Sequence, residues 1–357
     1  MDTLLSPRRR RFIGAATALG TLALTGCSDS LHSGRATATG QRLSGQTMGT
    51  AYTLRLAGSA LPDAALERLH ADLQSVLDGV DQRMSMYRPE SELVRLNQHH
   101  SQAPLRLSAD LFTVLQAGRQ VAEMTAGAFD VSVAPLVVSW GFGPLSRRAI
   151  PGASELHAGR EVLGYRSLEL DTQARTAIKR VPGLQADLGG IAKGYGVDLA
   201  AQLLLARGLQ NFMLEAGGEV RAEGRNTQGQ PWRIGIEEPD ASPQRARLVV
   251  PLSGLAMATS GDYRNYFEQG GRRYSHEIDP GSGEPINHSL CSVSVVAGDC
   301  MQADALATAL IVMGPERGMA LAQRLRIATH FILRGADGSL HDRSSDAFAA
   351  LRTTSTA

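Results

Sequence analysis

Residues 258–308 read ATSGDYRNYFEQGGRRYSHEIDPGSGEPINHSLCSVSVVAGDCMQADALAT. In this stretch His276 and Asp279 flank the end of an expected strand, which is followed by a Pro/Gly turn and a second strand. A helix is expected next, with Asp304 and Thr308 one turn apart. Because residues i and i+4 share a helix face, their oxygens can converge on one hard cation such as Mg²⁺. A cation site, an imidazole and nearby glycines together indicate phosphate chemistry.

Each of these residues also has an ordinary structural interpretation. Asp304 could cap the helix, Thr308 could be a simple helix residue, and His276 could be a hydrogen-bonded strand histidine. Asp279 lies in an Asp-Pro-Gly sequence, which is also typical of a plain turn. We favour the functional interpretation because the four features coincide in one short stretch.

The composition limits the class of protein. With 357 residues, the chain can form one large domain or two closely packed domains. A formal net charge of +1 and an aromatic content of 5% give no reason to expect nucleic acid as a partner.

The first 27 residues have the features of an export signal. Arg8 to Arg11 form a basic head that resembles a twin-arginine signal, and a short apolar run follows. Leu-Thr-Gly-Cys then resembles a bacterial lipobox, in which Cys27 would be lipidated. The alternative is an ordinary cleaved signal with an incidental cysteine. We therefore expect an exported protein that is lipid-anchored to the bacterial membrane and faces the periplasm.

After the signal, the chain is expected to form one folded domain. We expect residues 28–41 to form a flexible tether, residues 42–344 to form the domain, and residues 345–357 to form a disordered tail. Helical spacing of apolar residues predicts a helix over 62–81, and Ser108 is expected to cap a second helix. Mostly hairpin-like strands interrupted by helices follow, so the order favours an α+β fold over a regular βαβ repeat.

Export permits disulfides, and Cys291 and Cys300 are the only pair that remains beside Cys27. A strand over 290–296 would hold most of the chain between them extended, whereas a disulfide needs Cα atoms within about 7 Å. We expect two free, buried thiols.

The glycine-rich segment DLGGIAKGYG, residues 187–196, is expected to open a helix. Free N–H groups at a helix start can face an anion, and Lys193 adds a positive charge. The spacing is not that of a Walker motif or of a dinucleotide-binding fingerprint. Two further residues have open interpretations. Met48 is either core filler or an apolar cover for a flat ring, and Tyr87 is either a loop-packing aromatic or a stacking surface.

Nine motifs carry a resemblance to a known family. They are GQTMGT, MSMYRPESELVRLN, GAFDVSVAPLV, WGFGP, DLGGIAKGYGVD, EAGGEV, ATSGDY, SHEIDPGSGEP and ADALATAL, in that order from about Gly45 to Leu333. Their order resembles that of the ApbE family, the FAD:protein FMN transferases, whose bacterial members are often exported lipoproteins. The resemblance implies an α+β, T-fold-like, single compact catalytic domain with antiparallel sheets and packed helices.

The resemblance also implies a set of site residues. Separately from the resemblance, a hydroxyl nucleophile needs a base, and His276 is the candidate because an unperturbed imidazole has a pKa near neutrality. Asp279 could orient it or the waters of the metal. The residues implied to contact FAD are Met48, Tyr87, Ala128, Phe129, Asp130, Asp187, Lys193 and Ile278. Those implied to hold Mg²⁺ are Gly190, Asp304, Ala307 and Thr308. The chain departs from the family at two positions. Val138 stands where many members have Asn, and Glu215 stands where Asn or Asp is commoner.

The implied reaction moves FMN from FAD to a Thr or Ser hydroxyl of an acceptor protein and releases AMP. The implied acceptors are exported flavin domains of redox-driven ion pumps and related electron-transfer proteins. Two alternatives remain open at the same site: hydrolysis of FAD to FMN and AMP, and FAD binding without chemistry. A solute-binding lipoprotein would require two βαβ lobes, which the pattern does not show.

Overall fold

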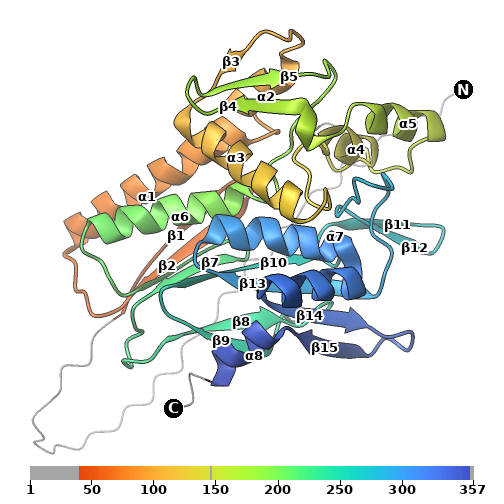
Figure 1. Ribbon diagram of the computed structural model, residues 1–357. Helices are drawn as coiled ribbons and strands as arrows, with labels where there is room; N and C mark the ends of the chain where they lie inside the picture. The colour runs from red at the N-terminus through yellow and green to blue at the C-terminus, as the bar shows by residue number, and fades with distance from the viewer. Residues whose placement is uncertain (1–39, 145–146, 354–357) are drawn as a thin grey trace, which may run out of the picture. The chain divides into compact units, whose positions relative to one another are not determined.

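The computed structural model describes residues 40–144 and 147–353, and the expected export signal, Cys27 and tether residues 28–39 lie outside these ranges. An eight-stranded sheet organises the described chain (Figure 1). All of its strand pairs are antiparallel. In spatial order the strands are β1 (Gln41–Thr47), β2 (Thr50–Leu56), β6 (Phe212–Ala216), β7 (Glu219–Glu223), β10 (Leu255–Gly261), β13 (Leu290–Ala297), β14 (Ala328–Arg334) and β15 (Leu340–Ser344).

Three helices, α1 (Asp63–Met84), α6 (Ala192–Ala206) and α7 (Cys300–Leu325), cover one face of this sheet (Figure 1). Leu69, Leu73 and Leu77 of α1 recur every fourth residue and are buried against Tyr52 and Leu54 of β2. Since alternate strand residues point to opposite faces, Thr53 and Arg55 of β2 lie on the other side of the sheet.

The opposite face of the sheet is only partly covered. A hairpin of β8 (Trp232–Glu237) and β9 (Ala246–Leu252) packs its apolar side on β7, β10 and β13 through a separate hydrophobic cluster. Trp232 and Ile234 of β8 belong to this cluster together with Val220 and Met257. The same face of β1 and β2 remains exposed and carries Arg42 and Arg55.

A second group of elements packs above α6 and α7 (Figure 1). It contains α2 (Glu92–Gln98), α3 (Ala109–Met124), α4 (Ala134–Ser139), α5 (Ala153–Glu161), a 3-10 turn (Tyr165–Ser167), the small sheet β3 (Leu105–Arg106), β4 (Leu168–Asp171) and β5 (Thr176–Lys179), and the hairpin β11 (Tyr266–Gln269) and β12 (Arg272–Ser275). Leu111 and Leu115 of α3 share one hydrophobic core with Leu306 and Leu310 of α7. This packing brings the loops of the second group to the ends of α6 and α7.

Helix α7 consists of two helical segments that meet at a kink. Gly314 breaks the helical geometry with φ 78°, and Pro315 follows it inside the element. Among the described residues, α7 alone is long and apolar enough to cross a membrane by length and composition. Its most apolar window is 61% buried inside the protein, as expected for a core helix.

Several sequence predictions can now be compared with the structure. The α+β class with antiparallel sheets is confirmed. The Ser108 hydroxyl accepts a hydrogen bond from the Leu111 N–H at 3.2 Å, so the predicted cap of α3 is confirmed. Cys291 and Cys300 are free and buried, as expected.

Two predicted boundaries are wrong. The disordered tail was expected from residue 345, but α8 (Asp346–Thr353) forms there and its Phe348 is fully buried, stacked on His330. The tether was expected to reach residue 41, but Gln41 already belongs to β1 and exchanges two hydrogen bonds with the backbone of Leu61. A buried aromatic side chain holds the first of these segments, and two partly buried hydrogen bonds hold the second, where composition alone suggests no order.

Candidate active site

The glycine-rich segment meets α7 so closely that side chains are excluded. A Cβ on Gly190 would lie 2.7 Å from the Thr308 hydroxyl oxygen, and a Cβ on Gly194 would lie 2.4 Å from the carbonyl oxygen of Cys300. Both distances are shorter than van der Waals contact, so only glycine fits at these positions. The first turn of α6 is thereby pressed against the first turns of α7.

Asp304 lies at this contact with only 3% of its surface exposed. Its Oδ2 accepts a hydrogen bond from the Gly194 N–H at 3.0 Å, and its Oδ1 lies 3.9 Å from the Lys193 ammonium. Burial raises the pKa of Asp304, and Lys193 opposes this shift. The N-cap of α7 is Asp299, whose side chain accepts the Gln302 N–H, so Asp304 is not a helix cap.

Lys193 is the cation of the cluster. Its ammonium contacts the carbonyl oxygen of Gly189 and the Oε1 atom of Glu219, both at 3.1 Å. Burial disfavours the charged amine, but Asp304 and Glu219 together raise the pKa of Lys193 above its ordinary value. Lys193 therefore stays protonated and partly balances the buried carboxylates.

Glu219 is a site residue that the sequence analysis missed, although it lies in the EAGGEV motif. It is 2% exposed, and its Oε2 atom has no hydrogen-bond partner among the described residues. Burial raises the pKa of Glu219. It also raises the pKa of the buried Glu277, to about 8. The buried carboxyl groups of Asp304, Glu219 and Glu277 thus share one ammonium group, that of Lys193. This surplus of carboxyl groups favours the binding of a further cation.

The residues expected to hold Mg²⁺ come together in the structure. Asp304, Ala307 and Thr308 occupy successive turns of α7, and the Thr308 hydroxyl lies 3.2 Å from the Ser260 hydroxyl. Within residues 40–144 and 147–353, no group of three or more His, Cys, Asp or Glu side chains has the arrangement of a metal site. The candidate set is instead one carboxylate with hydroxyl and carbonyl oxygens, and these are donors that suit Mg²⁺. The orphaned Glu219 oxygen and the glycine cradle fit a bound cation.

His276 follows β12 and is held by the backbone of the preceding loop. Its Nδ1 lies 3.2 Å from the Asn265 carbonyl oxygen, which also accepts the His276 N–H at 3.0 Å. Because a carbonyl only accepts, the neutral ring carries its proton on Nδ1. Its Nε2 makes no hydrogen bond with a described residue and lies 3.8 Å from Oε1 of Glu277. The ring meets the edge of Phe142 with centroids 6.3 Å apart.

Electrostatics keep this imidazole neutral. Desolvation and the charge of Lys193 lower the pKa of His276 to about 4, while the Asn265 carbonyl and Asp187 act in the opposite direction. The side chain is 38% exposed, so contact with water offsets part of the desolvation. A neutral histidine with a free Nε2 can accept a proton near neutral pH.

Asp279 does not contact His276 through any hydrogen bond or ion pair in the described chain. Its Oδ1 accepts the Gly281 N–H at 2.9 Å, and its backbone exchanges hydrogen bonds with Gly283 and Glu284. The structure therefore places Asp279 in a turn, where it shapes the loop that follows His276.

The charge of Asp187 acts on both His276 and Tyr87. The Tyr87 hydroxyl donates to the Phe142 carbonyl at 2.8 Å, and 64% of the residue is exposed. Asp187 accepts the Gly189 N–H at 2.7 Å. Burial raises the pKa of Asp187, whereas His276 and Lys193 act to lower it. An exposed aromatic ring next to these charges can stack on a flat ligand.

The remaining residues implied to contact FAD have different surroundings. Met48 adopts φ 45° in the turn between β1 and β2, and its terminal methyl group would lie 3.0 Å from a Cβ on Gly196 of α6. Both carboxylate oxygens of Asp130 are engaged, one by Ser132 and the other by the Tyr165 N–H. Ala128, Phe129 and Ile278 are buried in hydrophobic clusters. Ala128, Phe129, Asp130 and Ile278 are thus buried and leave little surface for a ligand, whereas Met48 is partly exposed.

Comparison with known proteins adds a family. Residues 48–332 match the model of the ApbE family. The FAD:protein FMN transferase of Vibrio cholerae is 44% identical over 298 residues, covering 83% of this chain and 88% of that protein. The FAD:protein FMN transferase of Haemophilus influenzae is 41% identical over 317 residues, covering 87% and 91%.

Solved structures agree with this result. The flavin transferase ApbE from Vibrio cholerae superposes with a TM-score of 0.80 at 42% identity, covering 88% of this chain and 99% of that one. The apo form of the flavinyl transferase ApbE from Pseudomonas stutzeri gives a TM-score of 0.80 at 40% identity, covering 88% and 97%. The family match spans most of the chain. The two relatives and the two solved structures also cover most of the chain, and each is at least 40% identical to it. The chain therefore belongs to the ApbE family, as its motifs predicted.

Proposed function

We propose that this protein is a FAD:protein FMN transferase that moves FMN from FAD to a Thr or Ser hydroxyl of an exported acceptor and releases AMP. Its family and the names of its relatives support the transferase activity. The observation that carries the chemical proposal is the neutral His276, whose Nδ1 is held by the Asn265 carbonyl and whose Nε2 is not hydrogen-bonded to any described residue. The charges of Lys193 and Asp187 act on this imidazole, and Lys193 also interacts with the buried carboxylates of Glu219 and Asp304.

In this proposal, His276 acts as the general base. The acceptor hydroxyl gives its proton to Nε2 while its oxygen forms a bond to the phosphorus next to the flavin ribityl chain. The bond from that phosphorus to the AMP oxygen breaks, and AMP leaves. His276 then returns the proton to solvent. The Lys193 ammonium faces the negative charge of the phosphates.

We further propose that Mg²⁺ is the metal of this site. Asp304 and Thr308 would hold it, together with the backbone at Gly190 and Ala307. When bound, it would neutralise the pyrophosphate and polarise the reacting phosphorus. The surplus of buried carboxyl groups around Lys193 supports a divalent cation there.

The proposed location is the periplasmic face of a bacterial membrane, with Cys27 carrying the lipid. The signal-like residues 1–27 support this location. The proposed acceptors are exported flavin domains of redox-driven ion pumps or related electron-transfer proteins. Cys27→Ser should move the protein from the membrane fraction to the soluble fraction in a fractionated cell. Membrane association that survives this change would exclude the lipid anchor.

The decisive experiment is the intact mass of an acceptor domain after incubation with FAD, Mg²⁺ and the mature chain. A gain equal to one FMN, lost when the acceptor Thr is replaced by Val, is the expected result. Release of free FMN and AMP without a mass gain would identify a hydrolase that uses water at the same site. FAD that stays intact would leave only a binding role and would overturn the proposal.

A further inference from the structure

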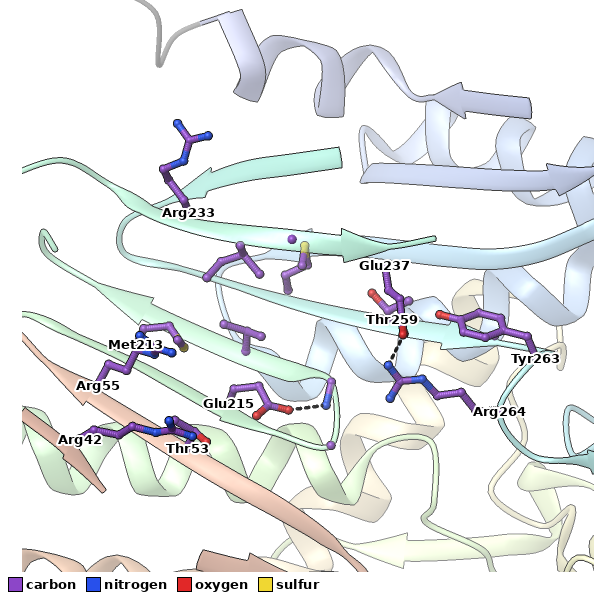
Figure 2. A pocket seen from close by; sticks show the side chains of 17 residues that line it. Arg42, Thr53, Arg55, Met213, Glu215, Arg233, Glu237, Thr259, Tyr263 and Arg264 are labelled. Atoms are coloured by element: carbon purple, nitrogen blue, oxygen red, sulfur yellow. Dashed lines mark hydrogen bonds and ion pairs between the residues drawn. The ribbon is translucent and has the colours of Figure 1, made fainter. Parts of the chain in front are cut away.

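A groove lies on the sheet face opposite the candidate active site (Figure 2). Its cavity of about 380 Å³ is within the usual range of ligand sites, about 300–1,000 Å³. One wall is β8, with Arg233 and Gly235, and the floor is the exposed face of β1, β2 and β6, with Arg42, Arg55 and Met213. Figure 2 shows Arg233 and Glu237 on the upper strand and Arg55 and Glu215 on the strands below it.

Four arginines and two glutamates line this groove, and three of the arginines lack partners among the described residues. The guanidinium groups of Arg42, Arg55 and Arg233 have no ion pair or hydrogen bond with any described residue. Arg42 and Arg55 also face each other directly across the β1–β2 pairing. Like charges at opposite positions of a sheet destabilise it, so the arrangement has no structural benefit of its own.

The two acidic residues that line the groove are already engaged. The Glu215 carboxylate accepts the Gly218 N–H at 2.9 Å, and Glu237 forms an ion pair with Arg264. The groove therefore keeps an excess of positive charge that an anionic ligand would neutralise.

The wall formed by β8 adds a second kind of recognition. In the described chain, β8 pairs with β9 alone, so its other edge has unpaired backbone groups that face the groove. No backbone hydrogen bond outside this hairpin involves Ile234, Gly235 or Ile236. Such an edge can pair with an extended peptide through its main chain. A small anion would satisfy the arginines but not this strand edge.

The groove ends next to the candidate active site. Thr259 of β10 lines the groove, whereas its neighbour Ser260 points to the other face of the sheet and contacts Thr308. Arg264, which closes this end through its ion pair with Glu237, directly precedes Asn265, whose carbonyl holds His276. A chain that leaves the groove at this end therefore reaches the candidate base by passing around one strand.

We propose that this groove binds an extended, acidic segment of the flavin acceptor protein, and this proposal rests on the proposed function. The segment pairs with the free edge of β8, places its carboxylates on Arg42, Arg55 and Arg233, and presents the hydroxyl to be modified beyond Gly261. The unpaired arginines and the open strand edge support a peptide of this charge and conformation.

The test uses Arg42→Glu/Arg55→Glu in the mature chain with FAD, Mg²⁺ and an acceptor domain that the wild type modifies. The KM for the acceptor should rise by about tenfold or more, because two attractions become repulsions. The Kd for FAD should stay unchanged. Arg68→Glu/Arg106→Glu is the matched control, since both residues are exposed, have no ion pair and lie away from the groove. Arg42→Lys/Arg55→Lys should restore most of the affinity.

The outcomes separate the two proposals. If the wild type adds no FMN to any acceptor, the proposed function fails and the groove proposal fails with it. If the wild type transfers FMN and the KM of Arg42→Glu/Arg55→Glu equals that of the control, only the groove proposal fails. A weaker binding of FAD in this variant would also overturn it, because the groove would then be part of the cofactor site.

Photo-crosslinking identifies the occupant directly. With p-benzoylphenylalanine in place of Met213 on the groove floor, the crosslinked peptide should come from the acceptor and contain Asp or Glu residues. The same probe in place of Leu205, which is exposed at the end of α6, should not capture the acceptor. Crosslinks to residues 28–39 of the same chain or to a second copy of this protein would overturn the proposal.

Discussion

The two faces of the central sheet hold charges in opposite settings. On the helix side, Lys193 of α6, Asp304 of α7 and Glu219 of β7 are packed together, where burial and neighbouring charges shift the pKa of each group. On the groove side, Arg42 and Arg55 lie in the open, and salt in the solvent screens their charges. Buried charges interact strongly and hold a reacting group in place, whereas exposed charges attract a partner and release it again. The difference predicts how each face responds to mutation.

The largest effect is expected for Asp304→Ala. It removes the carboxylate that we assign to the metal, so transfer should fall by at least about 10²–10³, and FAD should bind more weakly. Asp299→Ala is the matched control on the same helix, because it removes the N-cap and costs only about 1 kcal/mol of stability. Flavin transfer and FAD titration measure both variants. Full turnover in Asp304→Ala would exclude the metal assignment.

His276→Ala should separate chemistry from binding. Loss of a general base lowers transfer by about 10²–10⁴, while the Kd for FAD should change little. Asp279→Asn keeps the turn and should retain most activity, because Asp279 contacts the loop and not the imidazole. A large loss in Asp279→Asn would restore the role that the sequence implied for it.

The pH profile gives a second measurement of the same residue. The reaction needs neutral imidazole, and the pKa of His276 is lowered from its ordinary 6.5 toward about 4. The acidic limb of kcat/KM should therefore lie below pH 6.5 and not at it. It should disappear in His276→Ala measured at high enzyme concentration. A limb at or above pH 6.5 would show that the imidazole is not desolvated as described.

Glu219→Ala tests the buried side through stability. The change removes the carboxylate closest to Lys193, while Asp304 remains 3.9 Å from the ammonium. Loss of a hydrogen bond to a charged group should lower the free energy of unfolding by about 1.5–3 kcal/mol. Urea denaturation of the metal-free protein measures this loss. Glu169→Ala is the control, since its ion pair with Arg180 is also short but exposed on both sides. Equal losses in the two variants would show that burial does not distinguish the pairs.

The sequence predicted individual helices better than the contacts between segments that lie far apart in the chain. Periodic leucines were enough to locate α1, and the Ser108 cap located the start of α3. Neither pattern says that Gly190 touches Thr308, because that contact joins segments far apart in the chain. Only the resemblance of the motifs to a family placed them in one site.

The missed features have physical causes. Glu219 follows two glycines, and nothing in this local pattern shows that the Lys193 ammonium lies 3.1 Å from its carboxylate. Strand β1 is rich in Gly, Ser and Gln, and its order comes from pairing with β2. The sequence did not indicate the groove arginines either, because Arg42 and Arg55 face each other only in the register of the β1–β2 hairpin.

The smallest effect, and the one that tests the contrast most sharply, is the response to salt. Raising the ionic strength from about 0.05 to 0.5 M shortens the screening length several-fold, so the KM of the wild type for the acceptor should rise. In Arg42→Glu/Arg55→Glu this rise should be absent or reversed, because attraction has been replaced by repulsion. The stability difference between the wild type and Glu219→Ala should stay nearly constant over the same range, since screening acts weakly on buried pairs. An acceptor KM with the same salt dependence in the wild type and the arginine variant would place the acceptor's charges elsewhere on the surface.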